Sequence, residues 1–114
     1  MAFCLINKSN YFYNLSLIEK KIHKAKIAVV LKNNAYGHGL LEIAQLASEY
    51  GIRHAVVNTL NESNLIHSLF ESILVLQDIP LEKVEDNIII AINSISMLEK
   101  INSATRVEIK IDTG

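Results

Sequence analysis

Residues 106–114 read RVEIKIDTG, and this stretch decides between two possible folds. Apolar and charged side chains alternate along it: Val107, Ile109 and Ile111 occupy one face of a strand, and Glu108, Lys110 and Asp112 occupy the other. A central strand in an open, doubly wound sheet is covered by helices on both faces and is apolar throughout. The charged face therefore favours a barrel whose upper interior is polar.

On the N-terminal side of this stretch, apolar strands alternate with segments whose apolar residues recur at helical spacing. Phe12, Leu15, Ile18 and Ile22 form one such stripe, and Gly51 is well placed to end another. The predicted strands are 27–31, 54–58, 73–77, 87–93 and 106–113, and the predicted helices are 10–24, 40–50, 60–70 and 94–102, with a short helical piece after Pro80. This alternation is typical of βαβ units and a parallel sheet.

Five strands are compatible with two architectures. They can fill a complete doubly wound sheet of the flavodoxin type, or they can open an eight-stranded α/β barrel, which typically takes about 250 residues. The charge pattern of 106–112 favours the barrel. We therefore predict the fold class α/β, with residues 1–114 forming an incomplete, truncated N-terminal barrel domain that holds about five strands of a TIM-type (β/α)8 barrel.

Composition narrows the functional classes. The chain has 114 residues, of which 50% are hydrophobic and 20% are charged, and its net charge is −1. Acidic and basic residues are interspersed, with no basic stripe for a nucleic-acid backbone, and no apolar run has the length of a membrane span. A single cysteine fits a reducing compartment. We predict a cytoplasmic protein that binds neither nucleic acid nor membrane, and we predict no metal site.

Residues 26–40, KIAVVLKNNAYGHGL, place a lysine where an apolar strand gives way to a loop. Catalytic groups of α/β proteins lie at this end of a strand, and a lysine there can form a Schiff base with pyridoxal phosphate. The phenol of Tyr36 can donate to a phosphate oxygen, while Gly37 and Gly39 let the backbone approach a ligand. His38 is expected to hydrogen-bond to backbone. The alternative interpretation of Lys32 is a solvated strand cap.

The segment LKNNAYGHG, residues 31–39, resembles the cofactor-attachment motif of alanine racemases, with Asn33 in place of the usual alanine. The terminal VEIKIDTG resembles a later strand of that family, which carries a Lys-x-Asp-Thr-Gly sequence. Between them, AVVNTLNES and ILVLQDIP resemble the family's intervening units. The resemblance covers nearly the whole chain in order and spacing, and it implies a pyridoxal 5'-phosphate-dependent racemase that interconverts L-alanine and D-alanine and supplies D-alanine for cell-wall peptidoglycan.

The resemblance also implies roles for individual residues. Lys32 corresponds to the Schiff-base lysine, which also acts as the base on the D-alanine side, and Tyr36 corresponds to a phosphate-contacting tyrosine. Lys110 corresponds to a lysine that is often carbamylated, and Asp112 and Thr113 support that strand end. Paired with Glu108 or Asp112, Lys110 would instead be only an inward-facing structural lysine.

The family's second base is a tyrosine from the C-terminal β domain of the other subunit of a homodimer, and no residue of this chain corresponds to it. We therefore expect the C-terminal half-barrel and the β domain to be absent here and the isolated chain to be inactive. Two alternatives stay open: a non-catalytic pyridoxal-phosphate-binding homeostasis protein, and a five-stranded flavodoxin-like binding domain such as a receiver.

Overall fold

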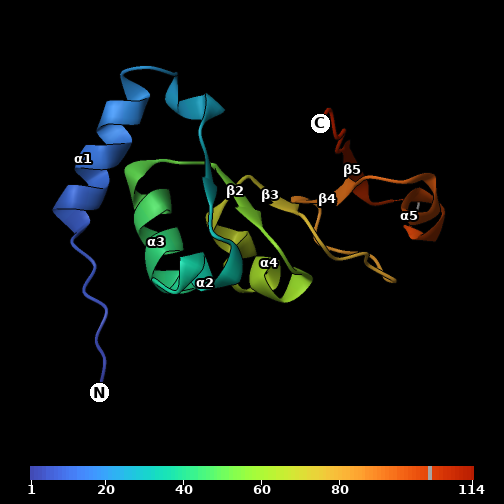
Figure 1. The fold of residues 1–114 in the computed structure, drawn as a ribbon, viewed down its shortest axis with the longest axis horizontal. Coiled ribbons are helices and arrows are strands. Elements are labelled where there is room, and N and C mark those ends of the chain that lie inside the picture. Colours follow the sequence, from blue (N-terminus) through green and yellow to red (C-terminus); the bar gives the residue numbers. More distant parts are fainter. Residues whose placement is uncertain (103) are drawn as a thin grey trace.

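The computed structural model describes residues 1–102 and 104–114, and its centre is one five-stranded parallel sheet (Figure 1). The strands are β1 (Ala28–Val30), β2 (His54–Val57), β3 (Ser72–Val75), β4 (Ile88–Ile92) and β5 (Arg106–Ile109). They lie side by side in chain order, β1-β2-β3-β4-β5, and each neighbouring pair is parallel. All their carboxyl ends therefore meet at the same edge of the sheet.

Helices connect most of these strands. Helix α1 (Lys8–Glu19) precedes β1. Helices α2 (Lys32–Tyr36) and α3 (Leu40–Tyr50) connect β1 to β2, α4 (Leu60–Ile66) connects β2 to β3, and α5 (Ile95–Lys100) connects β4 to β5. Short 3-10 turns lie at Lys24–Lys26 and His67–Leu69. The side chains of Thr59 and Ser94 accept hydrogen bonds at the N-termini of α4 and α5, as N-caps do. Gly51 ends α3 with φ of 100°, which confirms its predicted role as a helix stop.

The order of the strands decides the architecture. In a doubly wound sheet the first strand lies inside the sheet, with strands on both sides of it. Here β1 is the first in order and the chain never crosses back. A sequential parallel sheet is instead an arc of a barrel wall. This confirms the predicted α/β barrel class over the flavodoxin type.

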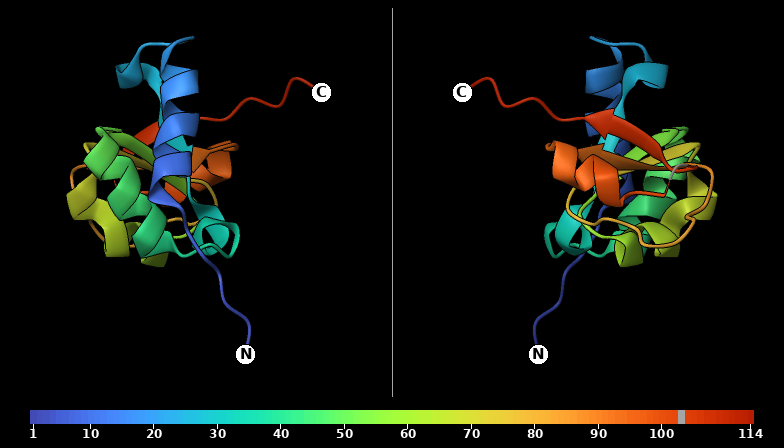
Figure 2. Two further views of the ribbon diagram at one scale, coloured as in Figure 1. Left: turned by 90° about the vertical axis from the view of Figure 1, so that its left-hand side faces the viewer. Right: turned by 90° about the vertical axis from the view of Figure 1, so that its right-hand side faces the viewer.

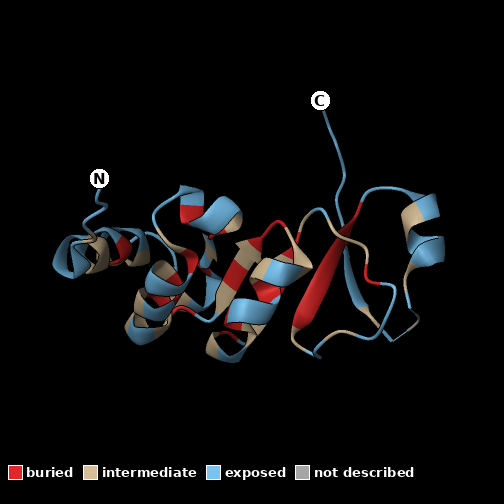
Figure 3. Ribbon diagram, turned by 90° about the horizontal axis from the view of Figure 1, so that it is seen from below, coloured by how far each residue is buried: buried red, intermediate tan, exposed pale blue. Residues whose placement is uncertain are grey.

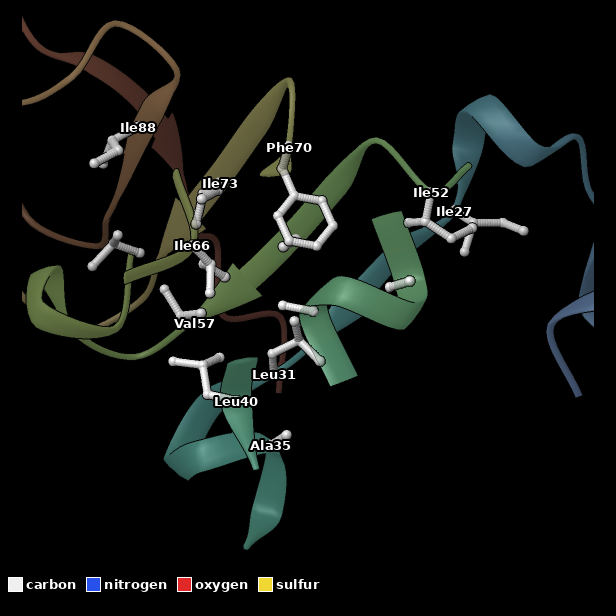
Figure 4. Close-up of a cluster of buried hydrophobic side chains, with 14 of the residues drawn as sticks. Ile27, Leu31, Ala35, Leu40, Ile52, Val57, Ile66, Phe70, Ile73 and Ile88 are labelled. Atoms are coloured by element: carbon white, nitrogen blue, oxygen red, sulfur yellow. The ribbon is translucent and has the colours of Figure 1, made fainter. Parts of the chain in front are cut away.

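The hydrophobic core lies on one face of this arc. Register pairs Ala55 with Ile73 and Ile73 with Ile88, so these residues share that face, and they belong to one cluster with Ala44 of α3 and Ile66 of α4. Figure 4 shows this cluster. Strand β4 is buried along its whole length, whereas β5 is exposed along its length (Figure 3). The helices therefore cover one side of the sheet, as the outer layer of a barrel does.

Several sequence predictions are wrong in detail. No helix lies between Pro80 and β4, where an irregular connection runs instead. Leu81 is 86% exposed, so a short helix there would have no apolar face to bury, and one turn alone does not offset the cost of nucleation. The last strand ends at Ile109 rather than at 113, and α1 ends at Glu19 rather than at 24.

The segment before α1 runs away from the body of the molecule, and so does the segment after β5 (Figures 1 and 2). Phe3, Leu5 and Ile111 are all largely exposed there. Within residues 1–102 and 104–114, no helix combines the length and the apolar character that crossing a membrane requires.

Candidate functional site

Lys32 lies directly beyond the carboxyl end of β1. The preceding residue, Leu31, is 2% exposed, and its N–H donates to the carbonyl oxygen of Val56 (2.8 Å), which extends the pairing of β1 with β2 by one residue. Lys32 itself is half-buried. A packed strand end therefore holds the backbone of this lysine, at the edge of the sheet where α/β proteins place their functional groups.

The four residues after Lys32, which make up the rest of α2, form a left-handed turn instead of a right-handed helix, and we call residues 32–37 the lysine turn. Asn33, Asn34, Ala35 and Tyr36 have φ between 52° and 56°. Asparagine tolerates this conformation, but other L-residues lose about 1–2 kcal/mol each in a left-handed helix. Such strain is concentrated at functional sites and persists only where the surroundings determine the backbone.

Local hydrogen bonds give the turn its shape. The N–H of Ala35 donates to the carbonyl oxygen of Leu31 (2.8 Å), and the Asn34 side chain accepts from the N–H of Leu40 (2.8 Å), where α3 begins. Nδ1 of His38 lies 3.0 Å from the carbonyl oxygen of Ala35. This is the backbone contact expected for His38. The turn ends at Gly37, whose φ of 86° suits glycine.

The next βα unit, formed by β2 and α4, makes hydrogen bonds to this turn. Nδ2 of Asn58 donates to Oδ1 of Asn33 (2.9 Å), and the N–H of Asn34 donates to Oε1 of Glu62 (3.1 Å). Oε2 of Glu62 accepts from the N–H groups of Asn58 (2.9 Å) and Thr59 (3.2 Å) at the start of α4. One carboxylate therefore joins the lysine turn to the capping box of the neighbouring helix.

These bonds set the charge state of Glu62. Partial burial raises the pKa of its carboxyl group, but the hydrogen bonds from the backbone N–H groups around it outweigh burial and lower that pKa below the ordinary value of 4.5. The carboxylate therefore contributes stability above pH 4.5, and this contribution is lost as the pH falls through the lowered pKa.

Glu62→Gln is expected to cost about 1 kcal/mol of unfolding free energy at pH 7, because glutamine cannot replace both acceptor oxygens. At pH 3 the difference between the two proteins should be smaller, because below pH 4.5 the unfolded state takes up a proton at this glutamate and part of the stabilisation by the folded carboxylate is lost. Urea unfolding at both pH values measures this. The pKa of Glu19 is also lowered, chiefly by a hydrogen bond from the Tyr50 hydroxyl, but that carboxylate is present in both proteins. A gap that stays constant with pH would contradict the prediction.

Tyr36 turns its side chain to solvent and is 59% exposed. It borders an apolar groove of about 400 Å³ that runs along β1 and is also lined by Tyr11, Val30 and His38. A larger open cavity of about 690 Å³ lies at the opposite, amino ends of the strands. The cations that line it are already engaged, Arg53 with Glu71 (2.5 Å) and Lys24 with Glu19 (3.6 Å). The candidate site is therefore the lysine turn.

The donor set of the turn fits pyridoxal phosphate in part. The primary amine of Lys32 can react with an aldehyde, and the exposed phenol of Tyr36 can donate to a phosphate oxygen. Asn58 is 9% exposed, and its Oδ1 is buried with no hydrogen-bond partner among the described residues, which leaves an acceptor for a ligand donor beside the turn. A Cβ on Gly39 would clash with Oε2 of Glu42, so a carboxylate already covers the start of α3 and a phosphate is disfavoured there.

The residues predicted near the C-terminus lie at the other edge of the sheet, beyond β5. The N–H of Lys110 donates to the carbonyl oxygen of Ile92 (2.7 Å), and Oδ1 of Asp112 accepts from the N–H of Gly114 (3.0 Å). Lys110, Asp112 and Thr113 are exposed, and the ion pairs of the described residues do not include Lys110. The structure thus brings Lys32 and Tyr36 together in one turn and separates them from Lys110 by three strands.

Two residues of the site were not predicted from the sequence. The motif Thr59-x-x-Glu62 has the spacing of a capping box and was a readable signal for the start of α4. That the same carboxylate also reaches Asn34 is a tertiary contact between residues 28 positions apart, with no local signal. The role of Asn58 is tertiary in the same way.

Comparisons with known proteins agree on one family. The family model described as "Alanine racemase, N-terminal domain" matches residues 6–114. The chain is 41% identical over 110 residues to the alanine racemase of Campylobacter concisus, covering 96% of this chain and 33% of that protein. It is 40% identical to the alanine racemase of Nitratiruptor sp., covering 100% and 34%. The chain thus spans about a third of the length of the curated relatives that it matches.

Solved structures of racemases are similar to this chain in fold. The crystal structure of alanine racemase from Corynebacterium glutamicum superposes with a TM-score of 0.82 at 26% identity, covering 96% of this chain and 35% of that one. A histidine racemase from Leuconostoc mesenteroides superposes with a TM-score of 0.64 at 26% identity, covering 82% and 27%. The five-stranded arc therefore resembles the N-terminal part of the alanine racemase barrel.

Proposed function

The chain belongs to the alanine racemase family, and on that premise we propose that it forms the first part of an enzyme that interconverts L-alanine and D-alanine. Such an enzyme supplies D-alanine for cell-wall peptidoglycan. Because the chain spans about a third of its curated relatives, we assign this activity to a longer protein in which residues 1–114 form the N-terminal part of the barrel domain.

One observation carries the proposal. Lys32 stands at the carboxyl end of the first strand, and a strained left-handed turn connects it to Tyr36. A lysine that only caps a strand and reaches solvent does not require four consecutive residues in the costly positive-φ conformation. A site that holds an amine and a phenol at a fixed separation does require a defined, strained backbone of this kind.

Pyridoxal 5'-phosphate is the cofactor that this pair would hold, with the amine of Lys32 toward its aldehyde and the hydroxyl of Tyr36 toward its phosphate. When bound, it supplies an electron-withdrawing ring that makes the α-hydrogen of an amino acid acidic enough to remove. Lys32 then acts as a general base and acid on one face of the substrate, taking the proton from Cα of D-alanine and returning it there in the reverse direction.

Racemisation needs a second base on the opposite face of Cα. We propose that this base comes from the second subunit of a homodimer, as family membership implies. Lys110 would support the cofactor, possessing an amine that can be carbamylated, and Asp112 and Thr113 would hold the end of its strand. We further propose a cytoplasmic enzyme that binds neither nucleic acid nor membrane.

Isolated residues 1–114 are expected to lack racemase activity. Barrels usually bind phosphate in the loops after their seventh and eighth strands, and the described sheet has five strands. An open arc also leaves β1 and β5 as unpaired edges, and Val30 is 45% exposed. For this chain, covalent labelling of Lys32 by the cofactor is therefore a better test of the proposed function than racemase activity.

We expect pyridoxal phosphate to label Lys32 in preference to surface lysines. The purified chain is incubated with the cofactor and reduced with borohydride, and the labelled peptides are mapped by mass spectrometry. Lys21 is the internal reference, because it is exposed and lies outside the turn that carries Tyr36. Equal labelling of Lys32 and Lys21 would count against the proposal, and a receiver-like binding domain would give that result.

A further inference from the structure

The lysine turn is attached to the rest of the fold by two side chains of the next βα unit. Consecutive residues of the turn, Asn33 and Asn34, bond to Asn58 (2.9 Å) and Glu62 (3.1 Å) respectively. The hydrogen bonds inside the turn fix its shape, but these two bonds fix its position against β2 and α4. They are independent of the packing of Leu31, which holds the turn from the side of β1.

We propose that Glu62 and Asn58 are positioning residues, which hold the left-handed turn so that Lys32 and Tyr36 keep their relative placement. This inference deepens the proposed function and rests on it, since it assigns a role in placing the lysine that carries the cofactor. In this role each residue acts through Asn33 or Asn34, and the bond from Nδ2 of Asn58 to Asn33 is separate from the unpartnered Oδ1 of Asn58.

The carboxylate of Glu62 is suited to this task because its two oxygens serve different elements. Oε1 accepts from the turn at Asn34, and Oε2 accepts from Asn58 and Thr59 at the start of α4. A glutamine of the same shape has one acceptor oxygen, so its NH2 group would face a backbone N–H on one side. In either orientation a glutamine leaves one of these two elements without an acceptor. The link between the lysine turn and α4 is therefore broken while the side-chain volume stays nearly unchanged.

The strain in the turn makes the connection necessary. Ala35 and Tyr36 have positive φ without the compensation that an asparagine side chain offers. Ala35 is 5% exposed and packs in the core, so the turn is anchored at this residue, while Tyr36 is exposed. Without Glu62 and Asn58, the segment from Lys32 to Asn34 can relax toward commoner backbone conformations, and the lysine moves relative to Tyr36.

Thr59 provides the matched control. Its hydroxyl accepts from the N–H of Glu62 (3.1 Å) and so forms the other half of the capping box, but it makes no bond to the lysine turn. Thr59→Ala should therefore weaken α4 about as much as Glu62→Gln does. The two variants differ in whether the turn loses its attachment.

The experiment measures amide hydrogen exchange and pyridoxal-phosphate labelling in the 114-residue chain and its variants. In Glu62→Gln we expect the exchange rate of the Asn34 amide to rise about 10-fold relative to that of Ile73, an amide of β3, and the ratio of Lys32 to Lys21 labelling to fall. In Thr59→Ala both ratios should match those of the unaltered chain. Asn58→Ala keeps the carboxylate of Glu62 and should lower the labelling ratio as Glu62→Gln does. It provides a second test of the attachment if Glu62→Gln does not fold.

Equal effects of Glu62→Gln and Thr59→Ala would overturn the inference and reduce Glu62 to a helix cap. Faster exchange at Asn34 with an unchanged labelling ratio would also overturn it, because the turn would then move without displacing the lysine. Failure of the proposed function looks different: Lys32 would show no preference over Lys21 in the unaltered chain, and the exchange data would still report on the attachment of the turn.

Discussion

Lys32→Ala is expected to abolish racemisation in a full-length enzyme built around this chain. The simplest such enzyme is a chimera in which residues 1–114 replace the matching third of the Campylobacter concisus alanine racemase, to which the chain is 41% identical over 110 residues. Removing a general base, the proposed role of Lys32, costs about 100- to 10,000-fold in rate, and losing the amine proposed to hold the cofactor would add to this loss. The measurement is the rate of D-alanine formation from L-alanine, together with the visible absorbance of the bound cofactor.

Lys21→Ala is the control, because it removes an exposed lysine outside the site and should leave the rate unchanged. Lys32→Arg keeps the positive charge but not a condensable primary amine, so it should be as inactive as the alanine variant. An active Lys32→Ala chimera would contradict the assignment. An inactive parent chimera that still binds the cofactor would instead favour the non-catalytic pyridoxal-phosphate-binding alternative.

Much of the fold could be predicted because its signals are local. The apolar stripe of 40–50 ends at Gly51 as predicted, and α3 has the predicted bounds, Leu40–Tyr50. Strand β2 follows from a run of apolar residues, and Ser94 marks the start of α5 by accepting from the N–H of Met97. In each of these elements, periodicity and a terminal residue agree with the packing that the sheet imposes.

The architecture needed more than local signals. Alternation of strands and helices is shared by barrels and doubly wound sheets, so the charged residues of 106–112 had to decide between them. The barrel prediction is correct, but Glu108 and Lys110 are exposed rather than enclosed, because β5 is an edge strand of the arc. The decisive fact is the sequential strand order, which is a property of long-range pairing and not of any one segment.

The site was predicted by residue type but not by conformation. The sequence placed Lys32 at a strand end and Tyr36 in the same turn, and both placements are correct. The left-handed backbone has one readable signal, the pair Asn33 and Asn34, since asparagine is enriched at positive φ. The replacement of the family's usual alanine by Asn33 is therefore compatible with this turn, and it provides the acceptor that Asn58 uses.

Ile90→Ala is expected to lower the unfolding free energy by about 2–5 kcal/mol, which is a large share of the 5–15 kcal/mol typical of a folded domain. Ile90 is 0% exposed in a strand that is buried along its length, and it pairs in register with Val75 on one side and Val107 on the other. The truncation leaves a cavity between sheet and helices that rigid strands cannot close. Urea unfolding followed by circular dichroism measures the loss.

Ile95→Ala removes the same atoms from a residue that is 77% exposed at the start of α5, and it should change stability by less than about 0.5 kcal/mol. The contrast between the two variants tests whether the arc has a genuine core on its helix-covered face. Similar losses for Ile90 and Ile95 would mean that the isolated chain is collapsed without specific packing, and the strained lysine turn would then have no rigid support. A large difference would show that β4 and its neighbours form the frame on which Lys32 is held.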